Sequence, residues 1–102
     1  ISGGRAPEYI RYDQALMSLT RYFFEKKLPV ASVCHGIEIV AAAGVIKGLE
    51  ATTVAKCKLD IESFGGKYVD REVVVCGNLV TARTWHDNPA WMREYIKLLA
   101  QK

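Results

Sequence analysis

The sequence predicts an α/β domain: a doubly wound sheet with helices on both faces, followed by a C-terminal hairpin and helix. Short apolar strand-like segments alternate with helical segments, which indicates βαβ units. Near the C-terminal end, two strand-like segments flank Gly77-Asn78, a pair suited to a tight hairpin turn. The chain has 102 residues, enough for one domain at most.

The chain opens on Ile1-Ser2-Gly3-Gly4, which resembles the end of a strand entering a turn. Strands usually run about 5–6 residues, so we expect the front of this strand, and earlier N-terminal strands of the sheet, to be missing from this chain. Residues 5–12 are predicted to form a loop, because Pro7 biases Ala6 toward extended geometry.

Asp13 is a candidate N-cap for a helix that runs to about Lys27. Its inner face is predicted from the spacing of Leu16, Leu19, Tyr22 and Phe23. Further along the chain, the pattern predicts a buried strand over 29–33, a helix over 37–43, a strand over 51–54, a helix over 59–64, an extended segment over 67–70, and strands over 73–75 and 79–82. The last helix begins at about residue 88, with an inner face of Trp91, Met92, Tyr95, Ile96 and Leu99.

Composition and charge exclude several classes of function. Half of the residues are hydrophobic, but no apolar run is long enough to span a bilayer, so no membrane partner is expected. The net charge of +3 comes from scattered basic residues, which does not favour nucleic-acid binding. Three cysteines without a C-x-x-C pair, and no visible secretory signal, indicate a reducing compartment, most simply the cytoplasm.

The segment Ser32-Val33-Cys34-His35-Gly36 carries the predicted chemistry. It has the form small-x-nucleophile-x-Gly at a switch from strand to helix, which is typical of a nucleophile elbow. At the start of a helix the dipole favours an anion, and the thiolate is the reactive form of cysteine. His35 is the candidate acid/base, and the backbone N–H groups of His35 and Gly4 are candidate oxyanion donors.

Other polar and sulfur groups carry weaker signals. A lone cysteine is usually an inert small hydrophobe, and Cys57 and Cys76, which lack an elbow, are predicted to be packing residues. His86 is predicted to be a loop or cap residue. No metal is expected, since the chain has two histidines and adjacent Cys34-His35 spacing is poor for a zinc site. No cofactor is expected either, because no G-x-G-x-x-G phosphate loop follows a strand.

Several segments resemble motifs of the ThiJ/PfpI superfamily, in its PfpI-like intracellular protease, glyoxalase III and deglycase branch. Gly3–Tyr9 resembles the GGRAPE segment, and Ala31–Gly36 resembles the A-S-I-C-H-G elbow. Ala43–Gly48 is similar to the A-G-V-L-(R/K)-G stretch. Val73–Arg83 resembles the V-V-V-D-G-N-L-V-T-S-R hairpin, and Ala90–Glu94 matches the last helix of the PfpI branch. The motifs occur in the family's order and span nearly the whole chain.

The resemblance implies that residues 1–102 form the C-terminal part of one flavodoxin-like domain of the class I glutamine amidotransferase type. It implies Cys34 as nucleophile, His35 as its partner, and a homo-oligomer in which Glu8 completes the site of a neighbouring subunit. The N-terminal part of the same domain is a further expected partner. A Glu that the family places on its first strand has no counterpart in this chain, and Val54-Ala55 stands where many members have Tyr-Pro. Cys76 replaces the usual Asp of the hairpin.

Three functions remain open from the sequence. The first is a cofactor-free cysteine enzyme that acts on reactive aldehydes or their adducts, of glyoxalase III or deglycase type. The second is an intracellular peptidase or amidase of PfpI type, in which Cys34 attacks a peptide carbonyl. The third is a redox-sensing stress protein without catalysis, in which Cys34 is oxidised to the sulfinic acid.

Overall fold

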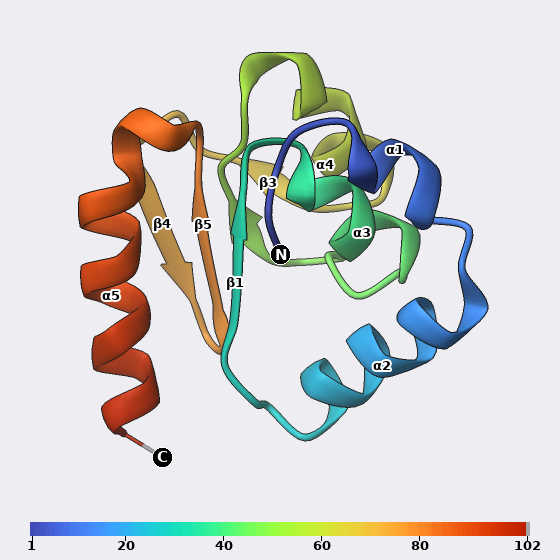
Figure 1. Ribbon diagram of the computed structural model, residues 1–102, viewed down its shortest axis with the longest axis horizontal. Helices are drawn as coiled ribbons and strands as arrows, with labels where there is room; N and C mark the ends of the chain where they lie inside the picture. The colour runs from blue at the N-terminus through green and yellow to red at the C-terminus, as the bar shows by residue number, and fades with distance from the viewer. Residues whose placement is uncertain (102) are drawn as a thin grey trace.

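The computed structural model describes residues 1–101, which form a small α/β domain (Figure 1). Its helices are α1 (Ala6–Ile10), α2 (Gln14–Glu25), α3 (Ile37–Ala42), α4 (Lys58–Ser63) and α5 (Asn88–Ala100). Its strands are β1 (Val30–Val33), β2 (Glu50–Ala51), β3 (Lys67–Tyr68), β4 (Val73–Cys76) and β5 (Leu79–Ala82). Three 3-10 turns complete it: η1 (Cys34–Gly36), η2 (Ala55–Cys57) and η3 (Trp85–Asp87).

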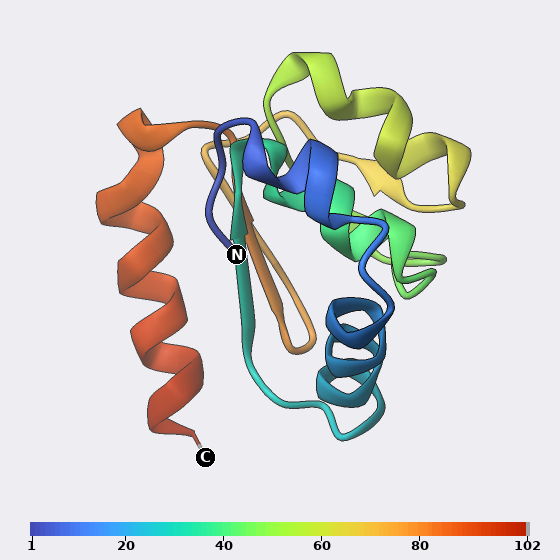
Figure 2. The ribbon, with the colours of Figure 1, turned by 45° about the vertical axis from the view of Figure 1, so that its right-hand side comes forward.

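The main sheet has the order β1-β5-β4, with β1 parallel and β4 antiparallel to the central β5. Figure 2 shows this sheet nearly edge-on, with α5 on one face and α1, α2 and α3 on the other. The predicted α/β architecture with helices on both faces is therefore confirmed. The register pairs Val33 with Ala82, so that β1 and β5 end at the same edge of the sheet. In open α/β sheets, ligands bind beyond this carboxyl edge.

The core lies between the main sheet and α3, which is buried along most of its length. Ile37, Ile39 and Val40 are at most 1% exposed, as expected for a helix whose residues are apolar except for Glu38. They belong to two adjoining clusters that include Ile46 and Leu79. Within residues 1–101, no helix is both long and apolar enough to cross a membrane.

The predicted loop over residues 5–12 is wrong, because this segment contains helix α1. Pro7 lies in the first helical turn, where the missing N–H of proline leaves no hydrogen bond unmade. It is also buried, and α1 packs against α3. Five residues are too few to show a helical period, so tertiary packing decides the conformation here.

Other boundaries differ less from prediction. Asp13 caps α2 as expected, and its side chain accepts a hydrogen bond from the Leu16 N–H at 3.0 Å. Strand β2 is shorter than the predicted 51–54, since residues 52–54 continue without strand pairing. The hairpin has Gly77 at φ 59°, in the left-handed region that a first central glycine adopts in a type II′ turn.

The predicted inner faces of α2 and α5 are only partly covered. Leu19 and Tyr22 are about half exposed, whereas Met17 and Thr20 of α2 are buried. Helix α5 has no buried residue, and Met92, Ile96 and Leu99 are exposed. The amphipathic pattern of both helices is present, but within the described residues it has little to pack against.

Ile1 lies beside β1 as the sequence predicts for the end of a strand. Its backbone nitrogen donates to the Ala31 carbonyl at 2.7 Å, and its carbonyl accepts from the Val33 N–H at 3.2 Å. Ile1 thus bonds Ala31 and Val33, the two neighbours of Ser32, which is the hydrogen-bond pattern of parallel strands. A strand that passed through Ile1 would therefore extend the main sheet beyond β1.

Candidate active site

Cys34 lies at the end of β1, where the chain reverses sharply into η1 and then α3. Its φ is 56°, in the left-handed region that non-glycine residues rarely adopt. A nucleophile in this strained conformation, between a strand and a helix, is the geometry of a nucleophile elbow. The predicted elbow is thus present, with one difference: the first turn after the strand is a 3-10 turn rather than α-helix.

Small residues make room for this reversal. A Cβ on Gly36 would lie 2.8 Å from the Ile1 carbonyl oxygen and 2.9 Å from Ser32 Oγ. A Cβ on Gly3 would lie 2.8 Å from the Cβ of Cys34. Real Cβ atoms do not approach other atoms so closely, so both positions require glycine. The second contact also shows that the Gly-Gly loop, distant in sequence, packs directly against the candidate nucleophile.

Cys34 and His35 form the candidate catalytic pair. The Cys34 Sγ lies 3.3 Å from the His35 Nδ1, and both side chains are partly exposed. This distance suits either a thiol that donates to the imidazole or a protonated imidazole that donates to a thiolate. This contact is the geometry that an acid/base role of His35 requires, and the role itself stays a prediction.

Thr53 fixes the backbone of the elbow from the segment after β2. Its hydroxyl donates to the Cys34 carbonyl at 2.8 Å. The side chain is fully buried, so the bond is protected from water. The next residue is Val54, which stands where many family members have Tyr and which offers no polar group near the elbow. The sequence did not single out Thr53, because nothing local connects it to a cysteine 19 residues away.

The predicted oxyanion donors lie on two loops that meet at Cys34. Gly4 has φ 78° and is exposed, in the loop that touches the nucleophile through Gly3. His35 is the second residue of η1, and the first N–H groups of a helical turn have no partner within it. Among residues 1–101, neither N–H donates to another backbone or side-chain acceptor. Their role as oxyanion donors stays a prediction.

Glu8 is on α1 and its side chain faces solvent. In the part of the chain that the structure describes, it makes no hydrogen bond to Cys34 or His35. Helix α1, which carries Glu8, contacts η1. Within one chain, Glu8 is near the candidate site without being part of it.

The remaining cysteines and His86 were predicted to be structural. Cys57 is 2% exposed, and burial, with the carboxylates of Glu38 and Asp60, raises the pKa of its thiol to about 12. It is a protonated core residue, as predicted. Cys76 is only half-buried at the end of β4, so its packing role is not confirmed. His86 is confirmed as a turn residue: it lies in η3 and its N–H donates to Thr84 Oγ1.

A group of charged side chains that sequence reasoning missed lies behind the elbow. Glu38 of α3 is 9% exposed, and burial raises the pKa of its carboxyl. Arg11 reaches Glu38 Oε1 at 3.5 Å and Asp60 Oδ1 at 3.7 Å. These residues come from three separate elements, so no spacing in the sequence connects them.

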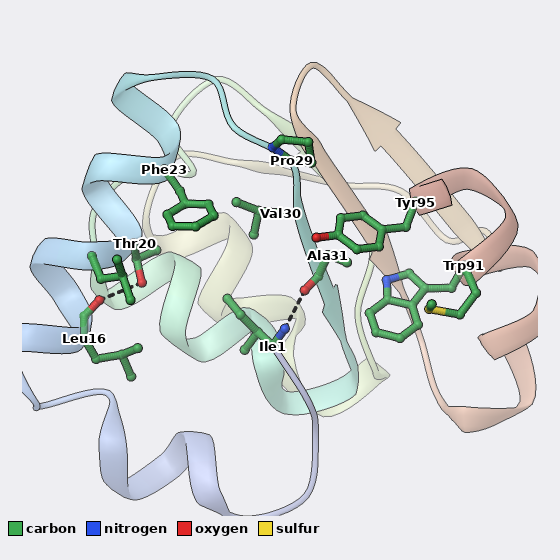
Figure 3. Close-up of a pocket in the computed structure, with 11 residues that line it drawn as sticks. Ile1, Leu16, Thr20, Phe23, Pro29, Val30, Ala31, Trp91 and Tyr95 are labelled. Atoms are coloured by element: carbon green, nitrogen blue, oxygen red, sulfur yellow. Dashed lines mark hydrogen bonds between the residues drawn. The ribbon is translucent and has the colours of Figure 1, made fainter. Parts of the chain in front are cut away.

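An apolar cavity of about 290 Å³ runs along the free edge of β1 (Figure 3). Figure 3 shows Ile1 between the side chains of α2, including Phe23, and the aromatic rings of Trp91 and Tyr95 on α5. Cys34 is not among its lining residues. The cavity is lined by the uncovered apolar faces of α2 and α5. It is distinct from the candidate active site.

Comparison with known proteins finds curated relatives over nearly the whole chain. A deglycase of Pyrococcus horikoshii is 46% identical over 97% of this chain and 60% of its own length. Protein/nucleic acid deglycase 2 of Escherichia coli is 39% identical over 97% of this chain and 58% of its own. This chain therefore spans about three-fifths of the length of such curated relatives.

Solved structures show the same fold. A two-domain protein of Anabaena variabilis, with a DJ-1/ThiJ/PfpI-like and a ferritin-like domain, superposes with a TM-score of 0.93 at 28% identity. That match covers 96% of this chain and 29% of the other. The model of the DJ-1/PfpI family matches residues 1–98. The chain belongs to the DJ-1/PfpI family and forms part of the family's α/β domain.

Proposed function

We propose that this chain supplies the nucleophile of a cofactor-independent deglycase or glyoxalase III type enzyme, which acts on reactive aldehydes or their adducts. The observation that carries the proposal is the left-handed Cys34 at the carboxyl edge of the sheet, with its sulfur 3.3 Å from His35 Nδ1. Relatives at 39–46% identity are named deglycases, which supports the same class of activity.

The proposed reaction with methylglyoxal follows from these groups. The Cys34 thiolate attacks the aldehyde carbon, and the new oxyanion is stabilised by the N–H groups of His35 and Gly4 before it is protonated. A base then removes the proton on the former aldehyde carbon, and the ketone carbon receives a proton, which gives a lactoyl thioester. Water hydrolyses this ester, so that methylglyoxal and water become lactate and Cys34 is regenerated. No cofactor enters the balance.

Turnover by Cys34 is the direct test. In the full-length protein, Cys34→Ser should lower the conversion of methylglyoxal to lactate, measured without glutathione, by at least about 10³-fold, because a hydroxyl is a far weaker nucleophile. The matched control is Cys76→Ser, a partly exposed cysteine outside the elbow, which should leave the rate unchanged.

Two other outcomes would replace the proposal. Cleavage of casein-like substrates, with no action on aldehydes, would favour a peptidase or amidase of PfpI type. Inactivity on both, with a reversible change of state in peroxide, would favour a redox sensor that uses the same thiol. A reducing compartment such as the cytoplasm would suit any of the three functions, since it keeps Cys34 in the thiol form.

We further propose that Glu8 completes the site of a neighbouring subunit in a homo-oligomer. Glu8 is exposed on α1, a helix that contacts η1, and it does not bond the Cys34–His35 pair of its own chain. A third group that orients the base is a regular part of such sites.

Mixing of inactive variants tests this arrangement. Cys34→Ala and Glu8→Gln should each be inactive, but equal amounts unfolded and reassembled together should regain about a quarter of wild-type activity, because random neighbours combine one intact Cys34 with one intact Glu8 in a quarter of the sites. If Glu8 acts within its own chain, or has no catalytic role, mixing restores nothing beyond the average of the two variants.

The apolar cavity beside β1 is proposed to receive the N-terminal part of the same domain. Ile1 already pairs with β1 in a parallel pattern, so a preceding strand would lie along the free edge of β1 between α2 and α5. The relatives have further length for such a segment. The apolar side chains of both helices would then gain the cover that they lack here.

Substitution of two leucines tests whether the N-terminal part of the domain fills this cavity. Leu19 lines the cavity and Leu59 lies on α4, and both are exposed in the described part of the chain. In the full-length protein, Leu19→Asp should lower the free energy of unfolding by about 2–5 kcal/mol, as for a charge placed in a core. Leu59→Asp should change it by less than about 0.5 kcal/mol, as at an open surface. Equal small effects in denaturant unfolding would show that the cavity stays open.

A further inference from the structure

Three potential metal ligands converge behind the elbow, from elements that are distant in sequence. Glu38 is on α3, Cys57 ends η2 and Asp60 is on α4. Each offers one donor atom, and these atoms all lie within 4.8 Å of one another. Glu38 and Cys57 are buried, and Asp60 is partly exposed.

The present contacts of this group leave a buried charge without full compensation. Glu38 is 91% buried, given its 9% exposure, and its Oε2 has no hydrogen-bond partner among the described residues. Arg11 contacts only the other oxygen, at 3.5 Å, and is shared with Asp60 at 3.7 Å. Both distances are long for charge-assisted hydrogen bonds, which are usually about 2.7–2.9 Å. The Arg11 Nε also has no partner among residues 1–101.

The donors are of the kind that zinc prefers. One sulfur and two carboxylate groups form a mixed set that suits Zn²⁺, whereas Mg²⁺ and Ca²⁺ require oxygen ligands alone. Tetrahedral bonds of 2.0–2.3 Å place donor atoms about 3.5 Å apart, so the side chains would need to close by about 1 Å. A cavity lined by Arg11, Glu38 and Asp60 adjoins the group and gives a fourth ligand, such as water, a place to bind.

We propose that Glu38, Cys57 and Asp60 bind one thiophilic divalent metal ion of the Zn²⁺ type, which joins α3 to η2 and α4 behind the elbow. On binding, the Cys57 thiol releases its proton to solvent and the sulfur becomes a ligand. The thiolate and the two carboxylates together offset the double positive charge of the ion. The sequence predicted no metal because its histidines are few and poorly spaced. That argument does not apply to this group, because it contains no histidine.

Arg11 would compete with a metal ion for the carboxylates of Glu38 and Asp60. A variant of Arg11 therefore distinguishes a metal site from a simple ion-pair network. Arg11 is at the end of α1, with a side chain 27% exposed, so it can move outward when a metal ion enters. Removal of its charge by Arg11→Gln should leave metal affinity equal or higher. If the two carboxylates serve only to hold Arg11, neither the wild-type protein nor this variant binds the metal ion.

The test uses Co²⁺ as a spectroscopic substitute for Zn²⁺, titrated into the metal-free full-length protein at neutral pH. A thiolate-to-cobalt charge-transfer band in the near ultraviolet should appear with one ion per chain. The band should persist in Cys34→Ala and Cys76→Ser and disappear in Cys57→Ser. Asp60→Asn, at a partly exposed position that folding tolerates, should weaken Co²⁺ binding at least ten-fold.

The proposal has its own stability readout, independent of enzymatic activity. Zn²⁺ should raise the Tm of the wild-type protein and should have a much smaller effect on Asp60→Asn. The matched control is Glu50→Gln, an exposed carboxylate away from the group, which should behave like the wild type. A band that disappears only in Cys34→Ala would place the metal at the catalytic pair and overturn the proposal. Absence of a band, or equal Zn²⁺ effects in Asp60→Asn and the wild type, would also overturn it.

Discussion

The left-handed conformation of Cys34 is the constraint on which the rest of the site depends. A non-glycine residue in this region costs about 1–3 kcal/mol, and the surrounding structure must hold it there. The Thr53 hydroxyl binds the Cys34 carbonyl, and β1 is bonded to Ile1 on one side and to β5 on the other. The strain is therefore stored at the one residue whose side chain must project from the sheet edge.

The same constraint explains why two distant segments meet at this point. The reversal brings the Gly3-Gly4 loop against the Cys34 Cβ, at a distance that only glycine allows. It also leaves the His35 N–H at the start of a helical turn, without a backbone partner in the described chain. The proposed nucleophile, its histidine partner and the His35 N–H thus follow from one local geometry, whereas Gly4 reaches the elbow from a distant loop.

Much of this could be predicted because the signals are local. The helix of α2 is specified by its Asp13 cap, the hairpin by Gly77-Asn78, and the elbow by small residues around Cys34. Periodicity also identified the apolar side of α5, but it could not show that this side is open in residues 1–101. Exposure depends on which other segments pack there, and a pattern within one helix does not contain that information.

The features that were not predicted all arise from tertiary contacts. Helix α1 is only five residues long, and it forms where Pro7 is buried and the helix packs against α3. Thr53 reaches Cys34 across 19 positions of the chain. The group of Glu38, Cys57 and Asp60 is assembled by α3 and α4, which pack side by side, and each residue alone has an ordinary structural interpretation.

The most direct measurement of the central claim is the relative alkylation rate of the three cysteines in the native full-length protein. Iodoacetamide at neutral pH, followed by peptide mass spectrometry, should modify Cys34 much faster than Cys76, although both are partly exposed, and should leave Cys57 unmodified. This result would show that the elbow activates the thiol beyond simple access. A Cys34 that reacts no faster than Cys76 would contradict the account of this residue as an activated nucleophile.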